Sequence, residues 1–302
     1  MKNVAASIRA KLLNLSRAEG MPLNALMERY ATGRFLYRLA ESKYRERFVL
    51  KGAQLFRIWE TEEHRPTRDV DFLGYGETTE EAIRRVFTEL TQMSVDLPDG
   101  LEWGEVATEL IREGVAYGGI RAFLSVHLAG ARLNIQVDVG FGDAITPGAV
   151  EKEWRELLDF PSARLLVYTP ETVIAEKLEA AVLLGMDNSR MKDFYDLHWL
   201  LSHLTFEGKV LIEAVTNTFA RRRTEIPKEP PLAFTEEFYT DAQKLVQWQA
   251  FLRKGNLPVK ELQDVLKEIS NFLLPVLEKK VSSHIWTPEE HWHQNTKLNE
   301  TN

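Results

Sequence analysis

The sequence contains no cysteine among its 302 residues, which excludes disulfide bonds, thiolate metal ligands and a cysteine nucleophile. It also has no run of the ~18 to 20 consecutive apolar residues that a membrane-spanning helix needs. The first residues, up to Arg17, lack the apolar core and the cleavage pattern of a signal peptide. We therefore expect a cytoplasmic protein in a reducing compartment.

Positive charge is in the minority. Lys and Arg number 38 against 45 Asp and Glu, a formal net charge of -7. This balance argues against a protein that holds nucleic acid over its whole surface, although it allows a local basic groove. Hydrophobic residues make up 44% of the chain, and glycine (17) and proline (12) stand at ordinary levels, so a disordered or fibrous chain is excluded. The length suits about two domains.

The apolar spacing predicts helical ends and a mixed middle, which is an α+β fold. Two N-terminal helices over residues 1–44 are expected to pack on a mixed α/β lobe of residues 45–168, followed by a helical lobe of residues 169–302. His284, His291 and His293 have no acid or cysteine at a defined ligand spacing, so we interpret them as tail residues. The expected strands cover 48–50, 69–73, 120–128, 132–139 and 165–168, and the expected helices cover 54–60, 80–93, 170–184, 190–203, 210–223, 235–252 and 259–278.

Carboxylates at strand spacing are the main chemical signal. Asp69 and Asp71 are two residues apart on a predicted strand, so both side chains leave the same face. Asp138 lies on the outward face of another alternating strand and would join them if the two strands were neighbours. Mg²⁺ prefers such oxygen ligands together with substrate phosphates. The alternative is that Asp69 and Asp71 are solvated charges at a strand end, near Arg65 and Arg68.

A glycine turn separates the apolar run Phe48-Val49-Leu50 from the helix predicted after it. In Lys51-Gly52-Ala53, the glycine allows the backbone to approach a phosphate group closely. The second glycine and the Lys-Ser/Thr ending of a Walker loop are missing, and a lone glycine is also the mark of an ordinary turn. The glycine turn indicates a phosphate-binding site only in combination with the motifs around it.

Four segments occur in an order that resembles a known family. They are FVLKGA (48–53), RPTRDVDF (65–72), TPE with AEKLEA (169–171 and 175–180) and RMKDFYDL (190–197). Together they are similar to the motifs of the AbiEii/AbiGii-type toxins, nucleotidyltransferase-fold proteins of bacterial toxin-antitoxin and phage-defence modules that include the MenT toxins. The resemblance spans residues 45–200, about half of the chain.

The resemblance implies a polymerase β-like nucleotidyltransferase lobe followed by a helical lobe, with two Mg²⁺ ions and a nucleoside triphosphate (NTP) as substrate. Asp69 and Asp71 would hold the metals. The third acid is Asp138 by strand geometry and Asp193 by the resemblance, and both are kept. The implied catalytic residues are Asp69, Asp71, Lys177 and Asp193, and the implied nucleotide-binding residues are Gly52, Ala53, Arg68 and Lys192.

Two details of these motifs bear on the expected chemistry. Ala53 stands where relatives commonly have Gly or Ser, which removes a hydroxyl contact to phosphate. In the last motif, Asp193 and Asp196 share a helix face, and the spacing pairs Lys192 with Asp196. Asp196 is therefore interpreted as a structural acid and Lys192 as a phosphate contact.

Three hypotheses for function follow. The first is a toxin that transfers a nucleoside monophosphate from an NTP to an acceptor hydroxyl, with the 3′ end of tRNA as one acceptor seen among relatives and a cognate antitoxin as a partner. The second keeps this reaction but changes the acceptor to a protein side chain or a small molecule such as an antibiotic. The third is a non-catalytic nucleotide-binding interaction module.

Overall fold

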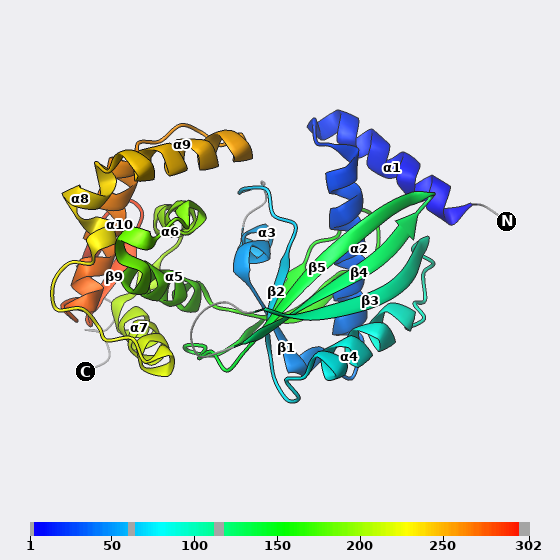
Figure 1. Ribbon diagram of the computed structural model, residues 1–302, viewed down its shortest axis with the longest axis horizontal. Helices are drawn as coiled ribbons and strands as arrows, with labels where there is room; N and C mark the ends of the chain where they lie inside the picture. Colours follow the sequence, from blue (N-terminus) through cyan, green and yellow to red (C-terminus); the bar gives the residue numbers. More distant parts are fainter. Residues whose placement is uncertain (1–2, 60–63, 112–117, 296–302) are drawn as a thin grey trace. The chain divides into compact units, whose positions relative to one another are not determined.

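The computed structural model describes residues 3–59, 64–111 and 118–295 (Figure 1). The chain forms two compact units, one of residues 1–142 and 149–168 and the other of residues 143–148 and 169–302. The first unit contains a seven-stranded mixed sheet with its helices, and the second is mainly helical. The predicted α+β fold class is confirmed. No helix within the described residues has the length and the apolar character needed to cross a membrane.

The first unit is built around its sheet, whose strand order is β3-β4-β5-β2-β1-β7-β6. The pairs β2–β5 and β1–β7 are parallel, and the other neighbours are antiparallel. Its elements are α1 (Val4–Glu19), α2 (Leu23–Ala40), η1 (Arg45–Arg47), β1 (Phe48–Lys51), η2 (Gly52–Leu55), α3 (Phe56–Trp59), β2 (Val70–Gly74), α4 (Glu80–Gln92), β3 (Leu101–Ile111), β4 (Gly119–Leu128), β5 (Ala131–Phe141), β6 (Val150–Trp154) and β7 (Ala163–Val167).

One face of this sheet is covered and the other is more open. Helices α2 and α4 pack on the covered face, α2 against β5 and β7 and α4 against β3 and β4. Alternate side chains of β4 and β5 are buried, as the sequence alternation predicts. Helix α4 begins as predicted at Thr79, whose side chain accepts a hydrogen bond from Ala82 N at 3.2 Å. The open face carries the polar members of β4 and β5.

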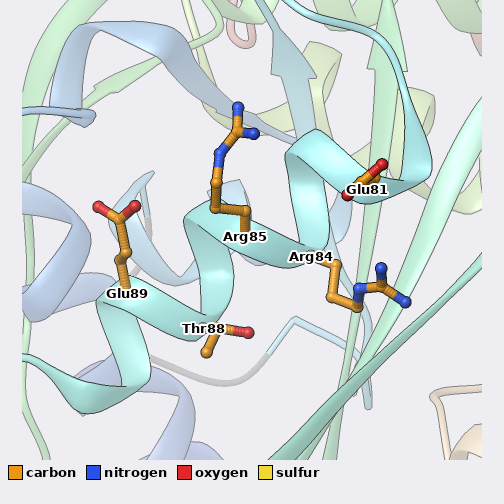
Figure 2. Close-up of a pocket in the computed structure, with 5 residues that line it drawn as sticks. All are labelled: Glu81, Arg84, Arg85, Thr88 and Glu89. Carbon is orange, nitrogen blue, oxygen red and sulfur yellow. The ribbon is translucent and has the colours of Figure 1, made fainter.

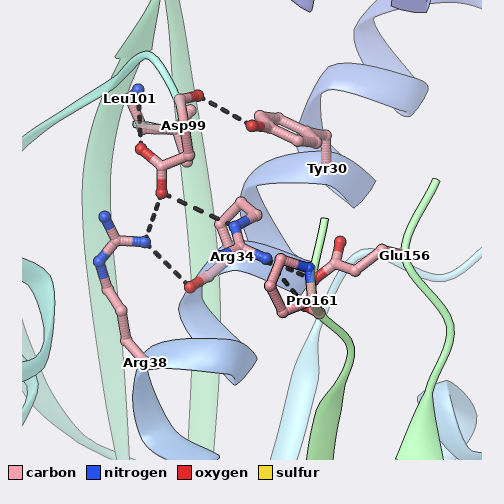
Figure 3. A network of polar contacts seen from close by, with 7 residues as sticks. All are labelled: Tyr30, Arg34, Arg38, Asp99, Leu101, Glu156 and Pro161. Atoms are coloured by element: carbon pink, nitrogen blue, oxygen red, sulfur yellow. Dashed lines mark hydrogen bonds and ion pairs between the residues drawn. The ribbon is translucent and has the colours of Figure 1, made fainter. Parts of the chain in front are cut away.

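Buried charges fasten α2 to the loops beside it (Figure 3). Arg38 Nη1 lies 2.6 Å from Asp99 Oδ2, and Arg34 Nη1 lies 3.2 Å from Glu156 Oε1. The Tyr30 hydroxyl donates to the carbonyl oxygen of Asp99 at 2.8 Å. We call Arg34, Arg38, Asp99 and Glu156 the buried network. Charges this far from water are stable only when each has a partner. Burial raises the pKa of Glu156 to about 7, against the opposing effect of Arg34.

The second unit consists of packed helices and a small sheet of order β10-β9-β8. Helix α5 starts at Pro170 behind Thr169, whose side chain accepts from Thr172 N, as predicted. The elements are α5 (Pro170–Leu184), η3 (Gly185–Asp187), α6 (Met191–His203), β8 (Phe206–Glu207), α7 (Gly208–Arg222), η4 (Leu232–Phe234), α8 (Glu236–Tyr239), α9 (Ala242–Gly255), α10 (Leu262–Leu277), β9 (His284–Thr287) and β10 (His291–Gln294).

Several element predictions were wrong. Strands β3 and β6 were not predicted, and the helix expected over 235–252 is broken into α8 and α9. The break arises because the Asp241 side chain accepts a hydrogen bond from Lys244 N at 2.9 Å and so starts a new helix. The histidines interpreted as tail residues lie in β9 and β10, which Trp286 anchors by donating from Nε1 to the carbonyl oxygen of Leu201 at 2.7 Å.

Candidate active site

Five strands of the first unit each place one charged side chain at the same level of the sheet. The register pairs Lys51 with Asp71, Asp71 with Asp138, Asp138 with Arg121, and Arg121 with Glu109. Residues in register on neighbouring strands share a face, so these side chains form a row across the open face. We call them the charged row. The strand of Asp138 is therefore a direct neighbour of the strand of Asp71, as the metal-site hypothesis requires.

Asp138 is held by an arginine that the sequence analysis did not single out. Arg121 Nε and Nη2 donate to the two carboxylate oxygens of Asp138, each at 2.8 Å. These bonds raise the pKa of Arg121 above its ordinary value and outweigh the opposing effect of burial, and the charges of Asp138, Asp69 and Glu109 add smaller increases. The Asp69 carboxylate thus influences the same end of the row from the residue before β2.

The glycine turn and the acid pair meet directly. Gly52 has a φ of +72°, and a Cβ at this position would lie 2.1 Å from Asp71 Oδ2. Only glycine allows both this backbone conformation and this approach. Ala53 and Gln54 continue into η2, and Gln54 Nε2 donates to the carbonyl oxygen of Asp69 at 3.1 Å. The turn is therefore bonded to the backbone of Asp69 and lies against the side chain of Asp71.

The side chains of Asp69 and Asp71 offer a donor set for a divalent cation. Asp69 and Asp71 supply only oxygen ligands, the set that Mg²⁺ prefers, and Mg²⁺ is commonly held by one or two carboxylates together with substrate phosphates. Over residues 3–59, 64–111 and 118–295, no three His, Cys, Asp or Glu side chains are placed to hold one metal ion. The Asp69–Asp71 pair fits a Mg²⁺–phosphate site, whereas the Asp138 carboxylate is bound by Arg121.

The second unit brings together the lysine and the acids of the helical motifs. Lys177 Nζ on α5 lies 2.6 Å from Asp193 Oδ1 and 2.9 Å from Asp196 Oδ2 on α6. Arg190 Nε approaches the other Asp193 oxygen at 2.6 Å. The Asp193 side chain is only 4% exposed, and it lies in the first turn of α6, where the helix dipole favours a carboxylate. Asp196 therefore binds Lys177, while the side chain of Lys192 is exposed.

A second ionic cluster fixes the helix that carries Lys177. Arg222 of α7 lies within 3.3 Å of Glu176 and within 2.9 Å of Glu179, and its Nη2 is 3.2 Å from Asp143. The neighbouring Thr224 hydroxyl donates to Glu179 at 2.5 Å. Because Glu176 and Glu179 bind Arg222 on α7, Lys177 is left directed towards α6. Although Arg222 is the last residue of α7, its side chain is only 23% exposed and is paired with carboxylates.

Two hollows in the described surface lie away from the charged row and from Lys177. One of about 350 Å³ lies along the exposed side of α4, where Glu81, Arg84, Arg85, Thr88 and Glu89 follow one helical face (Figure 2). None of the predicted site residues lines it. Another hollow, of about 220 Å³, includes Arg68, whose Nε lies 3.4 Å from Glu28 of α2. Arg68 is therefore placed beside α2 and not in the charged row.

Lys51 and Arg121, two members of the charged row, were not predicted as site residues from the sequence. Lys51 Nζ lies 5.3 Å from the centroid of the Tyr168 ring and opposite Asp71 in the register. The available signal was the polar alternation within the strand predicted over 120–128, in which Arg121 precedes Phe123 on the outward face. That signal needs the strand register before it becomes specific.

A mixed sheet with an aspartate set against a glycine turn after its first strand is the arrangement expected of a nucleotidyltransferase. A sequence profile described as "Nucleotidyl transferase AbiEii toxin, Type IV TA system" matches residues 34–268. The chain belongs to this family of toxins from type IV toxin-antitoxin systems. The predicted family and enzyme class are confirmed.

Two solved structures are similar to this chain at low sequence identity, and the first of them shares its fold. JHP933 from Helicobacter pylori is 15% identical, with a TM-score of 0.51 over 85% of this chain and 94% of that one. A second H. pylori protein, described as a candidate nucleotidyltransferase, is 14% identical, with a TM-score of 0.49 over 87% of this chain and 96% of that one. No curated protein sequence matches this chain.

Proposed function

We propose that this toxin is a Mg²⁺-dependent enzyme that transfers a nucleoside monophosphate from an NTP to a hydroxyl at an RNA 3′ end, with tRNA as the first candidate. The contact between Gly52 and the Asp71 carboxylate carries the proposal. It places a turn whose backbone a phosphate can approach closely next to an acid that can bind the cation of the same phosphate. A cognate antitoxin and a cytoplasmic location belong to the same proposal.

The residues of the first unit have separate roles. Asp69 and Asp71 bind Mg²⁺, which when bound offsets the charge of the phosphates and favours ionisation of the acceptor hydroxyl. Gly52 and Ala53 admit the triphosphate to the backbone of the turn, and Lys51 adds a positive charge to this end of the charged row. The bidentate pair with Arg121 supports a positioning role for Asp138, which holds the guanidinium at the other end.

In the second unit, the Lys177 ammonium is a cation held in a fixed position. The bonds to Asp193 and Asp196 hold the Lys177 ammonium in one place, so that little reorganisation is needed when it stabilises phosphate charge. Lys192, which is exposed on the first turn of α6, is proposed as a further phosphate contact. Arg68 keeps this role only if it leaves Glu28 when the nucleotide binds.

The test is label transfer. The protein is incubated with each α-labelled NTP, Mg²⁺ and total tRNA, and RNA, protein and small-molecule fractions are separated. We expect label in tRNA, and we expect a loss of at least about 1000-fold in Asp71→Ala, since several kcal/mol of charge stabilisation are removed. Asp96→Ala is the matched control, because Asp96 is an exposed aspartate outside the charged row.

Each outcome selects one hypothesis. Label in protein or in a small product, still dependent on Asp71, would keep the chemistry and replace the acceptor. If Asp71→Ala transfers as much label as Asp96→Ala, the proposed metal site is wrong. Calorimetric titration with Mg²⁺–NTP adds a readout independent of turnover, with binding expected to weaken in Asp71→Ala alone.

A further inference from the structure

The open face of the β4–β5 hairpin carries an aromatic ring among polar side chains. Phe123 of β4 is 38% exposed, although its strand neighbours Ala122 and Leu124 are fully buried. In the described part of the chain, none of the ring contacts involves Phe123. Its neighbours across the sheet are Ala107 on one side and Gln136 on the other, so a small side chain and a planar amide flank the ring.

Four pairs of residues in register lie along the open face of this hairpin, and the last pair contains Asp138. Starting near the turn, the pairs are His127 with Arg132, Ser125 with Asn134, Phe123 with Gln136, and Arg121 with Asp138. Successive pairs on one face are two residues apart, about 7 Å, so the series is about 20 Å long. We call these eight residues the hairpin track. Apart from the Asp138 carboxylate, which Arg121 binds, the track consists of basic groups, amides, a hydroxyl and an aromatic ring, and these groups hold single-stranded nucleic acid.

The order of strands assigns this track to the acceptor and not to the NTP. Gly52, the proposed phosphate turn, follows β1, whereas the track lies on β5 and β4, and Asp71 of β2 lies between them. In phosphoryl transfer the attacking and leaving oxygens lie roughly in line on opposite sides of the phosphorus. If pyrophosphate leaves on the β1 side, the acceptor hydroxyl must arrive from the β5 and β4 side.

Charges on the neighbouring strand β3 limit where a strand of nucleic acid can lie. Strand β3 presents Glu102 opposite His127 and Glu109 opposite Arg121, and these acids repel a phosphate backbone. Ala107, opposite Phe123, leaves the ring open on that side. A strand of nucleic acid is thus favoured over β4 and β5, where the net charge is more positive, and disfavoured over β3.

We infer that the hairpin track binds the single-stranded 3′ end of the acceptor RNA, with Phe123 stacking on one of its bases. This inference rests on the proposed function and specifies its substrate class as an unpaired RNA end. Stacking on a ring is tolerant of base identity, so Phe123 supplies affinity and position while the charged row receives the terminal hydroxyl.

The experiment measures binding without turnover. Fluorescence anisotropy records the Kd of the full-length protein for a short 5′-fluorescein oligoribonucleotide that is single-stranded and ends in CCA, with no NTP present. We expect Phe123→Ala to raise this Kd roughly 5- to 150-fold, the effect of losing one base-stacking contact. Phe123→Tyr and Phe123→Trp keep a ring and should stay within about threefold of the unchanged protein.

Tyr75→Ala is the matched control. Tyr75 is another exposed aromatic of the same unit, 46% exposed, and it follows the end of β2 that is remote from Asp71. Its removal should leave the Kd unchanged. Thermal unfolding of each variant checks the fold, and since Phe123 is partly exposed, we expect all of them to fold. Calorimetric Mg²⁺–NTP binding should be the same in Phe123→Ala and the unchanged protein.

The remaining results would overturn the inference in separable ways. Equal RNA affinity of Phe123→Ala and Tyr75→Ala would remove the stacking role. Weaker Mg²⁺–NTP binding with unchanged RNA binding would assign the ring to the base of the NTP. Absence of RNA binding by the unchanged protein would reject the track, even if label transfer to another acceptor upheld the reaction. Phe123-dependent RNA binding without any transfer would instead reject the reaction and keep the track.

Discussion

The first unit uses the same pair of chemical groups in two ways on the two faces of one sheet. Under α2, the guanidinium of Arg38 meets the carboxylate of Asp99, and both side chains are 4% exposed. On the open face, Arg121 meets Asp138, with side-chain exposures of 30% and 19%. Burial makes the first pair a structural requirement, whereas water and substrate can reach the second. The exposure of an arginine–carboxylate pair therefore indicates whether the pair stabilises the fold or is accessible to substrate.

The largest expected effect contrasts the two carboxylates. Asp99→Asn should lower the free energy of unfolding by about 3–5 kcal/mol, because it leaves the buried guanidinium of Arg38 without a compensating charge. Asp138→Asn should lower it by less than about 1 kcal/mol, because Arg121 can turn to water. Urea unfolding of both variants measures the difference. Equal losses would show that the two faces do not differ as described.

The next effect concerns pH and the buried network. The pKa of Glu156 is raised from 4.5 to about 7, chiefly by burial, so the folded state holds this proton more tightly than the unfolded chain. Its contribution to the free energy of unfolding is therefore full below pH 4.5 and is lost as pH rises to about 7, a change of about 3 kcal/mol.

Glu156→Gln removes this titration. Unfolding by urea at several pH values should show that the unchanged protein loses stability relative to the variant between about pH 4.5 and pH 7. A constant difference over this range would mean that the pairing with Arg34 outweighs burial. Glu153→Gln, at an exposed position of β6, is the control and should leave the pH profile unaltered.

The smallest expected effect on stability tests the turn beside the charged row. Gly52→Ala should cost about 1–3 kcal/mol and most of the activity, because the alanine is strained at a φ of +72° and its Cβ displaces the Asp71 carboxylate. Gly20→Ala matches the strain at a φ of +70° with nothing within 4 Å of the added Cβ. It should cost about 1 kcal/mol and keep full activity. Label transfer by Gly52→Ala at the level of Gly20→Ala would separate the turn from the reaction.

Much of the fold could be predicted from local pattern. The two N-terminal helices, α4 with its Thr79 cap, the β4–β5 hairpin and the start of α5 follow from apolar spacing and capping residues. Strand β3 was not predicted because its burial is irregular and its register with β4 shifts between Trp103 and Val106. A strand whose faces are not cleanly separated leaves no two-residue period in the sequence.

The structure brings some of the predicted site residues together and places others apart. The structure brings Asp71, Gly52 and Asp138 together in the first unit, and it brings Lys177 together with Asp193 in the second. Arg68 lies beside α2 instead, and Lys192 points to solvent. Nothing in the local sequence separates a lysine that binds two acids from one on a solvated helix face, because the acids arrive from another helix.

The sequence by itself determined the motif order, the acids at alternate strand positions, the family and the enzyme class. The tertiary structure decided which partner each charge has. In the hairpin, Ala129 and Gly130 both have positive φ, so the turn has two residues and Arg121 faces Asp138. With the three-residue connection that the sequence suggested, Asp138 would face Ala122. A slip of one residue moves every side chain to the other face, so register, which depends on backbone conformation at the turn, creates the charged row.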